Sequence, residues 1–157
     1  MKKYLSSIIL GLNDALVEML GCLIGYTITI DNSFHIGIIG LITGISACLS
    51  MSASEFLSSR YVLNKNPFKA SLYVGISYLI CVLLMVFPFF IFSKYLACIL
   101  VFIVFSIIII IFNYFISKFR KESFIKNLSL MYLLSLFVFF ISFFISIFIN
   151  SGLNVNI

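Results

Sequence analysis

Long apolar segments separated by short polar stretches run along the whole chain. A helix needs about 20 predominantly apolar residues to cross a bilayer, and five segments reach that length. The last three contain no charged residue, and runs such as Ile107–Phe112 lack the alternating polarity of a β-barrel strand. The pattern predicts an all-α membrane protein, with a single transmembrane domain over residues 1–157. The expected spans are residues 5–30, 36–57, 70–92, 95–117 and 128–149.

The composition agrees with this pattern and excludes other classes of protein. Apolar residues make up 63% of the 157 residues and charged residues only 10%, whereas soluble domains have about 45–50% and about 25%. A soluble fold of this size leaves roughly a third of its extended surface exposed, which is too much for so few polar side chains to cover. The composition therefore excludes a soluble globular domain, a disordered chain and a nucleic-acid binder, despite a net charge of +5.

The basic residues predict the topology. Short loops rich in Lys and Arg stay in the cytoplasm, and a cytoplasmic N-terminus puts nine of the ten basic residues on that side, leaving only Lys94 outside. We therefore expect a cytoplasmic N-terminus, an external C-terminus and residence in the cell membrane. Because Asp14 and Glu18 interrupt the first apolar segment and no cleavage motif follows, we expect no cleaved signal peptide. The nine basic residues are Lys2, Lys3, Arg60, Lys65, Lys69, Lys118, Arg120, Lys121 and Lys126.

Small residues recur at steps of three and four in the first two spans. This spacing is typical of the seam between two helices, and small residues let membrane helices approach closely. Helix packing by itself explains the glycines, and dimerisation through these faces is a further hypothesis. The seams consist of Ser7, Gly11, Asp14, Glu18, Gly21 and Gly25, and of Gly37, Gly40, Gly44, Ala47, Met51, Ser54 and Ser58.

Three acidic residues lie inside predicted spans: Asp14, Glu18 and Glu55. A charge at a helix centre costs about 2.5–3.5 kcal/mol, and such residues usually mark an ion or proton path. At about 1.5 Å per residue, Asp14 and Glu18 lie about 13 Å and about 19 Å from the start of the first span. Glu55 lies only about 3 Å from the end of the second span, so snorkelling or pairing with Lys2 or Arg60 is the alternative for this residue.

Met51 adds a sulfur ligand at the depth of Asp14, because it lies about 9 Å from the inner end of the second span. Carboxylates with a thioether suit a divalent transition metal, whereas Mg²⁺ and Ca²⁺ gain nothing from sulfur. The predicted metal ligands are Asp14, Glu18, Met51 and Glu55. Cys22 would extend the soft surface, although we expect all four cysteines to be small apolar filler.

The short distance between two carboxylates predicts that metal binding at this site is coupled to proton release. Asp14 and Glu18, one turn apart in a low dielectric, disfavour each other's ionised form. At least one should hold a proton without metal and lose it to a divalent cation, which is the minimum for antiport. One chain has too few ligands, so we expect a C2 homodimer. We expect no cofactor and no enzymatic activity, because no nucleophile–base pair is present and the only histidine, His35, falls in the predicted outer loop.

Two motifs resemble the vacuolar iron transporter family. The first span has Gly11-Leu-Asn-Asp-Ala-Leu-Val-Glu-Met-Leu-Gly21 followed by Gly25, and the second leads from Gly40-Leu-Ile-Thr-Gly44 to Ser50-Met-Ser-Ala-Ser-Glu-Phe-Leu-Ser58. Asn66-Pro-Phe-Lys-Ala70, which opens the third span, also looks like that family. The resemblance covers nearly the whole chain and is most specific over the first two spans.

The resemblance implies a dimer that exports Fe²⁺, and also Mn²⁺, from the cytosol in exchange for protons. It implies that Asp14 and Met51 line a path between the protomers, and that Glu55 matches the acidic residue after the Met motif. The ligand role of Glu18 is inferred from its depth in the membrane and not from the resemblance. The chain lacks the long, Glu-rich insertion of that family, since residues 58–69, which connect the second and third spans, contain no acidic residue. It also has Ala47 where many relatives have an acidic residue.

Two alternatives to a metal–proton antiporter stay open at this stage. One is a membrane scaffold or accessory subunit whose glycine faces bind a partner helix, and the other is a passive cation channel that uses the same acids. The expected partners are a second copy of the chain, a divalent transition-metal ion, protons and the lipid bilayer, with no nucleic acid.

Overall fold

The computed structural model describes residues 4–63, 65–120 and 123–153, which form five α-helices and no strand. All five helices are long and apolar enough to cross a membrane, so the prediction of five spans is confirmed and the chain is an integral multi-pass membrane protein. Lys2, Lys3 and Lys121, which contributed to the topology prediction, lie outside the described residues. The helices are α1 (Leu5–Thr29), α2 (Ser33–Ser59), α3 (Pro67–Ile91), α4 (Lys94–Arg120) and α5 (Phe124–Leu153).

The second helix begins earlier than its apolar segment. The side chain of Asn32 accepts hydrogen bonds from the backbone N–H groups of Phe34 and His35, at 2.9 and 3.3 Å. An N-cap of this kind satisfies donors that the first helical turn leaves free. The expectation that His35 lies in a loop is therefore wrong: His35 is an exposed residue in the first turn of α2.

The third helix has similar local signals. The Asn66 side chain accepts a hydrogen bond from the Lys69 N–H at 3.2 Å, and Pro67 occupies the first turn, where its missing N–H costs nothing. Near the other end, Pro88 lies inside the helix, which continues to Ile91 and closes with a hydrogen bond from the Phe92 N–H to the Pro88 carbonyl. The helix thus ends about one turn after Pro88.

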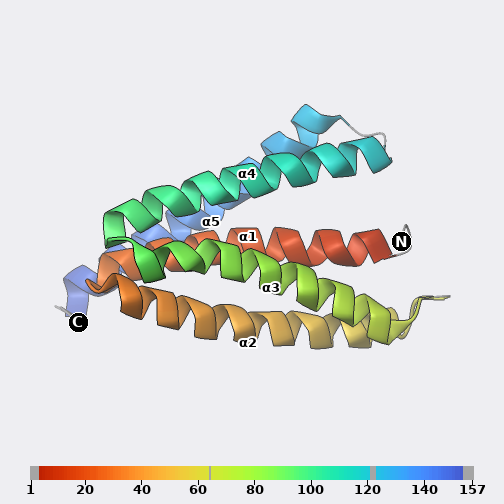
Figure 1. Ribbon diagram of the computed structural model, residues 1–157, viewed down its shortest axis with the longest axis horizontal. Coiled ribbons are helices and arrows are strands. Elements are labelled where there is room, and N and C mark those ends of the chain that lie inside the picture. Colours follow the sequence, from red (N-terminus) through yellow and green to blue (C-terminus); the bar gives the residue numbers. More distant parts are fainter. Residues whose placement is uncertain (1–3, 64, 121–122, 154–157) are drawn as a thin grey trace.

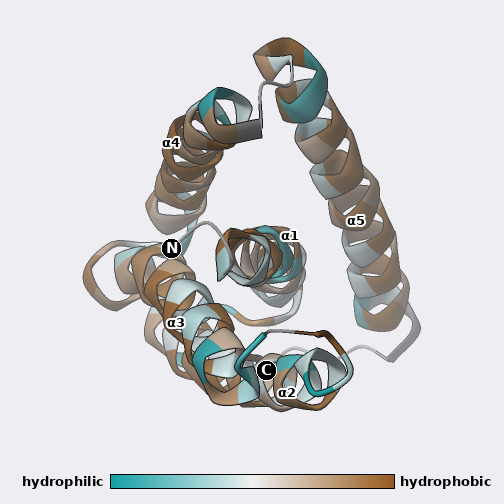
Figure 2. Cartoon of the chain, turned by 90° about the vertical axis from the view of Figure 1, so that its right-hand side faces the viewer, coloured by the Kyte–Doolittle hydropathy of each residue, from teal (hydrophilic) through white to brown (hydrophobic). Residues whose placement is uncertain are grey.

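The other four helices surround α1. Figure 2 shows α1 in the middle, with α2 and α3 on one side and α4 and α5 on the other. The start of α1, the α2–α3 connection and the α4–α5 connection lie at one end of the molecule (Figure 1). We call this end the basic end because it carries Lys65, Lys69, Lys118 and Lys126. The opposite end carries Asp31 and Lys94.

The glycine seams pack within the chain. Gly11 lies against Val74 and Ser77 of α3. In α2, Gly37, Gly40 and Gly44 face side chains of α1 and α3, whereas Gly21 and Gly25 of α1 face serines of α5. Small residues thus let α1 contact several neighbours closely, and helices of the same chain occupy the faces that could have served a dimer.

Candidate metal path

Asp14 is the one predicted ligand that the single chain leaves exposed. It lies on α1, in a groove that α1 shares with Leu130, Leu134 and Val138 of α5. Among the described residues, its carboxylate makes no hydrogen bond or ion pair, and its nearest electrostatic neighbour is Glu18. A carboxylate in the middle of a spanning helix therefore lies exposed in a groove, without a partner among the described residues.

Glu18, one turn further along α1, is half-buried and has a partner. The hydroxyl of Tyr78 on α3 donates a short hydrogen bond to Glu18 Oε2. Tyr78 is fully buried, so its ring packs in the core while its hydroxyl reaches the carboxylate. Tyr78 was not among the predicted site residues; the available signal was a tyrosine in the middle of a charge-free span, since buried Tyr hydroxyls usually find a hydrogen-bond partner.

Glu55 is buried near the basic end, with a relative exposure of 6%. Its Oε1 atom accepts a hydrogen bond from Ser7 Oγ at 2.7 Å and pairs with Lys65 Nζ at 2.6 Å. Pairing with a base was the stated alternative for Glu55, but the partner is Lys65 of the α2–α3 connection rather than Arg60. One chain therefore already neutralises a carboxylate that was predicted to bind the metal.

Met51 is half-buried at the edge of the core. The α2 surface beside it is exposed and carries three serines at intervals of one helical turn, although it belongs to a spanning helix. Cys22 of α1 is half-buried, and the four cysteines are free thiols. The three serines are Ser46, Ser50 and Ser54.

The four predicted ligands do not form a complete site within one chain. In the described part of the chain, no three Asp, Glu, His or Cys side chains lie close enough together to hold a metal ion. Asp14 and Met51 are accessible, whereas Glu18 and Glu55 are engaged by Tyr78 and Lys65. The arrangement offers one free carboxylate and one thioether on neighbouring helices, which are too few ligands to complete the coordination of a divalent transition metal.

The comparison with known families points to the same two helices. Residues 5–64 match the VIT family, a stretch that includes all of α1 and α2 and therefore all four predicted ligands. No curated protein and no solved structure matches the chain. The VIT family consists of transporters rather than enzymes, and the match indicates a membrane metal-ion transporter. The resemblance drawn from the sequence is confirmed over α1 and α2, where residues 5–64 match the VIT family.

Proposed function

We propose that the chain exports Fe²⁺ or Mn²⁺ from the cytosol in exchange for protons, along a path between two copies of the chain. Asp14 and Met51 are the ligands that meet the ion between the protomers. Glu18 lies one turn deeper than Asp14, and Glu55 lies at the cytoplasmic mouth. The basic end faces the cytoplasm, as the positive-inside rule requires, and the C-terminus faces outwards.

The exposure of Asp14 carries this proposal. An outward-facing carboxylate in lipid costs about 2.5–3.5 kcal/mol at a helix centre even on the lenient scale. A second copy of the chain removes this cost, because it covers Asp14 and brings a second Asp14 to the same metal ion. Exposed Ser46, Ser50 and Ser54 on α2 also support a contact with a second copy of the chain, since small hydroxyl side chains allow close approach and hydrogen bonding between membrane helices.

Competition between metal and proton supports exchange. An uncovered Asp14 next to Glu18 is unfavourable as a pair of negative charges in a low dielectric, so a proton resides on the pair when no metal is bound. Binding of a divalent cation to the same oxygens releases that proton. The thioether of Met51 favours Fe²⁺ over Mg²⁺ or Ca²⁺, which bind oxygen ligands.

Metal flux in proteoliposomes with an imposed pH gradient tests the proposal. We expect gradient-driven Fe²⁺ and Mn²⁺ movement in the wild type, and its loss in Asp14→Asn and Met51→Ala. Asp31→Asn is the matched control, because it makes the same chemical change at an exposed carboxylate outside the helices, and it should transport normally. Flux that does not depend on the pH gradient would instead indicate a passive channel. A folded protein that gives no flux would indicate a scaffold or accessory subunit.

Cross-linking tests the dimer. In a variant whose four native cysteines are replaced by alanine, Asp14→Cys should form an intermolecular disulfide in membranes under mild oxidation. Leu79→Cys is the control, because Leu79 is an exposed residue of α3, outside the two helices that carry the predicted ligands. Equal cross-linking at both positions, or none at position 14, would contradict a path between two Asp14 residues.

A further inference from the structure

A cation of the chain itself occupies the carboxylate at the basic end. Among the described residues, Glu55 is the one acidic residue at this end, and its Oε1 atom contacts Lys65 Nζ at 2.6 Å and Ser7 Oγ at 2.7 Å. The Lys65 and Glu55 side chains are 13% and 7% exposed, and Ser7 is buried. The contact is therefore a largely buried ion pair, unlike the exposed pairs that solvent screens. We call it the entry ion pair.

The backbone on both sides of Lys65 is held in place. The Lys65 N–H donates to the Val62 carbonyl at 3.3 Å, and the Asn66 N–H donates to the Tyr4 hydroxyl at 3.4 Å. The Tyr4 ring in turn stacks on Tyr73 of α3, with ring centroids 5.3 Å apart. The long, flexible Lys65 side chain can therefore leave Glu55 without any movement of the connection.

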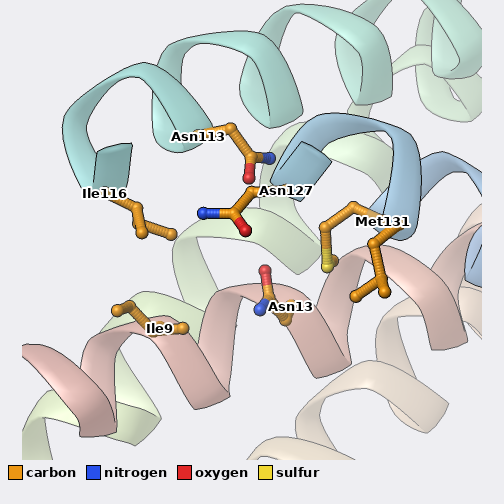
Figure 3. Close-up of a pocket in the computed structure, with 7 residues that line it drawn as sticks. Ile9, Asn13, Asn113, Ile116, Asn127 and Met131 are labelled. Carbon is orange, nitrogen blue, oxygen red and sulfur yellow. The ribbon is translucent and has the colours of Figure 1, made fainter. Parts of the chain in front are cut away.

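The cavity beside this end offers a cation no alternative charge. It has a volume of about 160 Å³ and lies between α1, α4 and α5, and Figure 3 shows Asn13, Asn113 and Asn127 pointing towards one another across it. Its lining residues include no Asp or Glu, and a cation buried without a counter-charge is costly. Among the described residues, an ion that approaches from the basic end therefore meets its first carboxylate at Glu55.

We propose that Lys65 is a tethered cation that competes with incoming ions for Glu55, and that this competition admits divalent cations and excludes monovalent ones. The inference rests on the proposed metal export. At the same distance, the Coulomb attraction of the carboxylate for a divalent ion is twice its attraction for an ammonium group. A divalent ion can thus displace Lys65, whose ammonium group stays protonated and turns to the solvent.

A monovalent ion has no such advantage. It carries the same charge as the ammonium group that it would replace, and the charge-assisted hydrogen bond from Lys65 to Glu55 would be lost. It is also not tethered to the chain, whereas Lys65 stays beside the carboxylate at a high effective concentration. Lys65 is therefore a specificity-determining residue at the mouth of the path, although it is not a metal ligand.

Mn²⁺ binding at equilibrium tests the competition. An Asp14→Asn background removes the ligand deeper in the membrane, so that binding at Glu55 is measured by itself. In this background, Lys65→Met should lower the dissociation constant of Mn²⁺ by about tenfold or more, because it leaves a buried charge uncompensated. The electron paramagnetic resonance signal of free Mn²⁺ gives the constant in detergent. Unchanged binding, or a gain that survives an added Glu55→Gln, would overturn the proposal.

Matched variants separate the entry ion pair from the general charge of this end. Lys65→Arg keeps a cation at Glu55 and should bind Mn²⁺ like its parent. Lys69→Met removes a basic residue that is exposed in the first turn of α3, where salt screens its charge, and should change the affinity little. An equal gain in Lys69→Met would overturn the proposal. Lys65→Gln removes the charge but keeps a neutral donor, so it replaces Lys65→Met if that variant does not fold.

Competition by K⁺ tests the selectivity. In wild-type proteoliposomes, replacing choline chloride with KCl at constant ionic strength, which keeps screening equal, should leave Mn²⁺ flux unchanged. In Lys65→Met the same replacement should lower the flux at low Mn²⁺ concentration, because K⁺ then has access to an unpaired Glu55. A Lys65→Met protein that is as insensitive to K⁺ as the wild type would overturn the selectivity.

The outcomes separate this inference from the proposed function. A folded Lys65→Met or Lys65→Gln without a gain that depends on Glu55 would overturn the role of Lys65 and leave the exchange at Asp14 intact. A wild-type protein that moves no metal would overturn the export, and the Mn²⁺ titration in the Asp14→Asn background would still decide whether Lys65 competes for Glu55.

Discussion

Lys65 Nζ lies 2.6 Å from Glu55 Oε1, and the same carboxylate oxygen accepts the Ser7 hydroxyl at 2.7 Å. The contact joins the α2–α3 connection to the end of α2 and the start of α1. The two ionic side chains are 13% and 7% exposed, so neither charge is fully solvated. A metal ion that uses Glu55 must therefore displace Lys65, a constraint that Asp14 does not share.

Loss of Lys65 should destabilise the protein. Lys65→Met leaves the buried Glu55 carboxylate with only one neutral donor, and removing one partner of a buried ion pair typically costs about 3–5 kcal/mol. Glu55→Gln in the same chain removes the unpaired charge and should recover most of the loss. The apparent melting temperature in detergent, followed by the size-exclusion peak of heated samples, measures both effects.

Lys69→Met is the matched control for Lys65→Met, because Lys69 is an exposed residue of the first turn of α3 with no ion pair in the described chain. It should change the melting temperature little. If Lys65→Met and Lys69→Met were equally mild, or if Glu55→Gln gave no recovery, the buried pair would not contribute to stability.

The Tyr78–Glu18 hydrogen bond should also contribute to the stability of the protein. Tyr78→Phe keeps the buried ring but removes the donor to the half-buried Glu18, and the loss should lie at or below the about 1–3 kcal/mol of a fully buried acceptor without a partner. A double-mutant cycle with Glu18→Gln, read from melting temperatures, should give a coupling of similar size. Tyr73→Phe, an exposed tyrosine on the same helix, should be neutral. Simple additivity of Tyr78→Phe and Glu18→Gln would contradict the contact.

The helices and the acidic positions could be predicted from the sequence because both follow from local properties. Hydropathy over about 20 residues identifies a span, and Asp14, Glu18 and Glu55 stand out in such segments by their charge alone. The ends of the helices required side-chain chemistry: Asn32 and Asn66 extend α2 and α3 beyond their apolar segments as N-caps.

The partners of those acids could not be predicted, because the later spans are apolar on all sides and give no sign of which face points inwards. Tyr78 reaches Glu18 only through the packing of α3 on α1. Lys65 reaches Glu55 through a connection whose course depends on where α3 starts. The glycine steps predicted close packing but not its partners, and Gly21 and Gly25 in fact contact α5 rather than α2.

The ion pair at the opposite end should contribute little to the stability of the protein. Lys94 Nζ lies 2.8 Å from Asp31 Oδ1, but the Asp31 side chain is 89% exposed, and exposed ion pairs contribute about 0–1 kcal/mol. Asp31→Asn should therefore leave the melting temperature almost unchanged at both low and high salt. A drop as large as that of Lys65→Met would mean that Asp31 has a partner beyond this contact.

Close packing of α2 on α3 at Gly44 should be intolerant of a single methyl group. A Cβ atom there would overlap the Val82 side chain and lie 3.2 Å from Met19 Sδ. Because Val82 and Met19 are both fully buried, neither has open space to move into, and overpacking of this kind costs about 1–3 kcal/mol. Gly44→Ala should lower the melting temperature, and Val82→Ala in the same chain should restore part of it by removing the overlapping methyl groups. Ser46→Ala, on the exposed face of α2, is the control and should be neutral. A Gly44→Ala protein as stable as Ser46→Ala would show that α2 and α3 can separate at this point without cost.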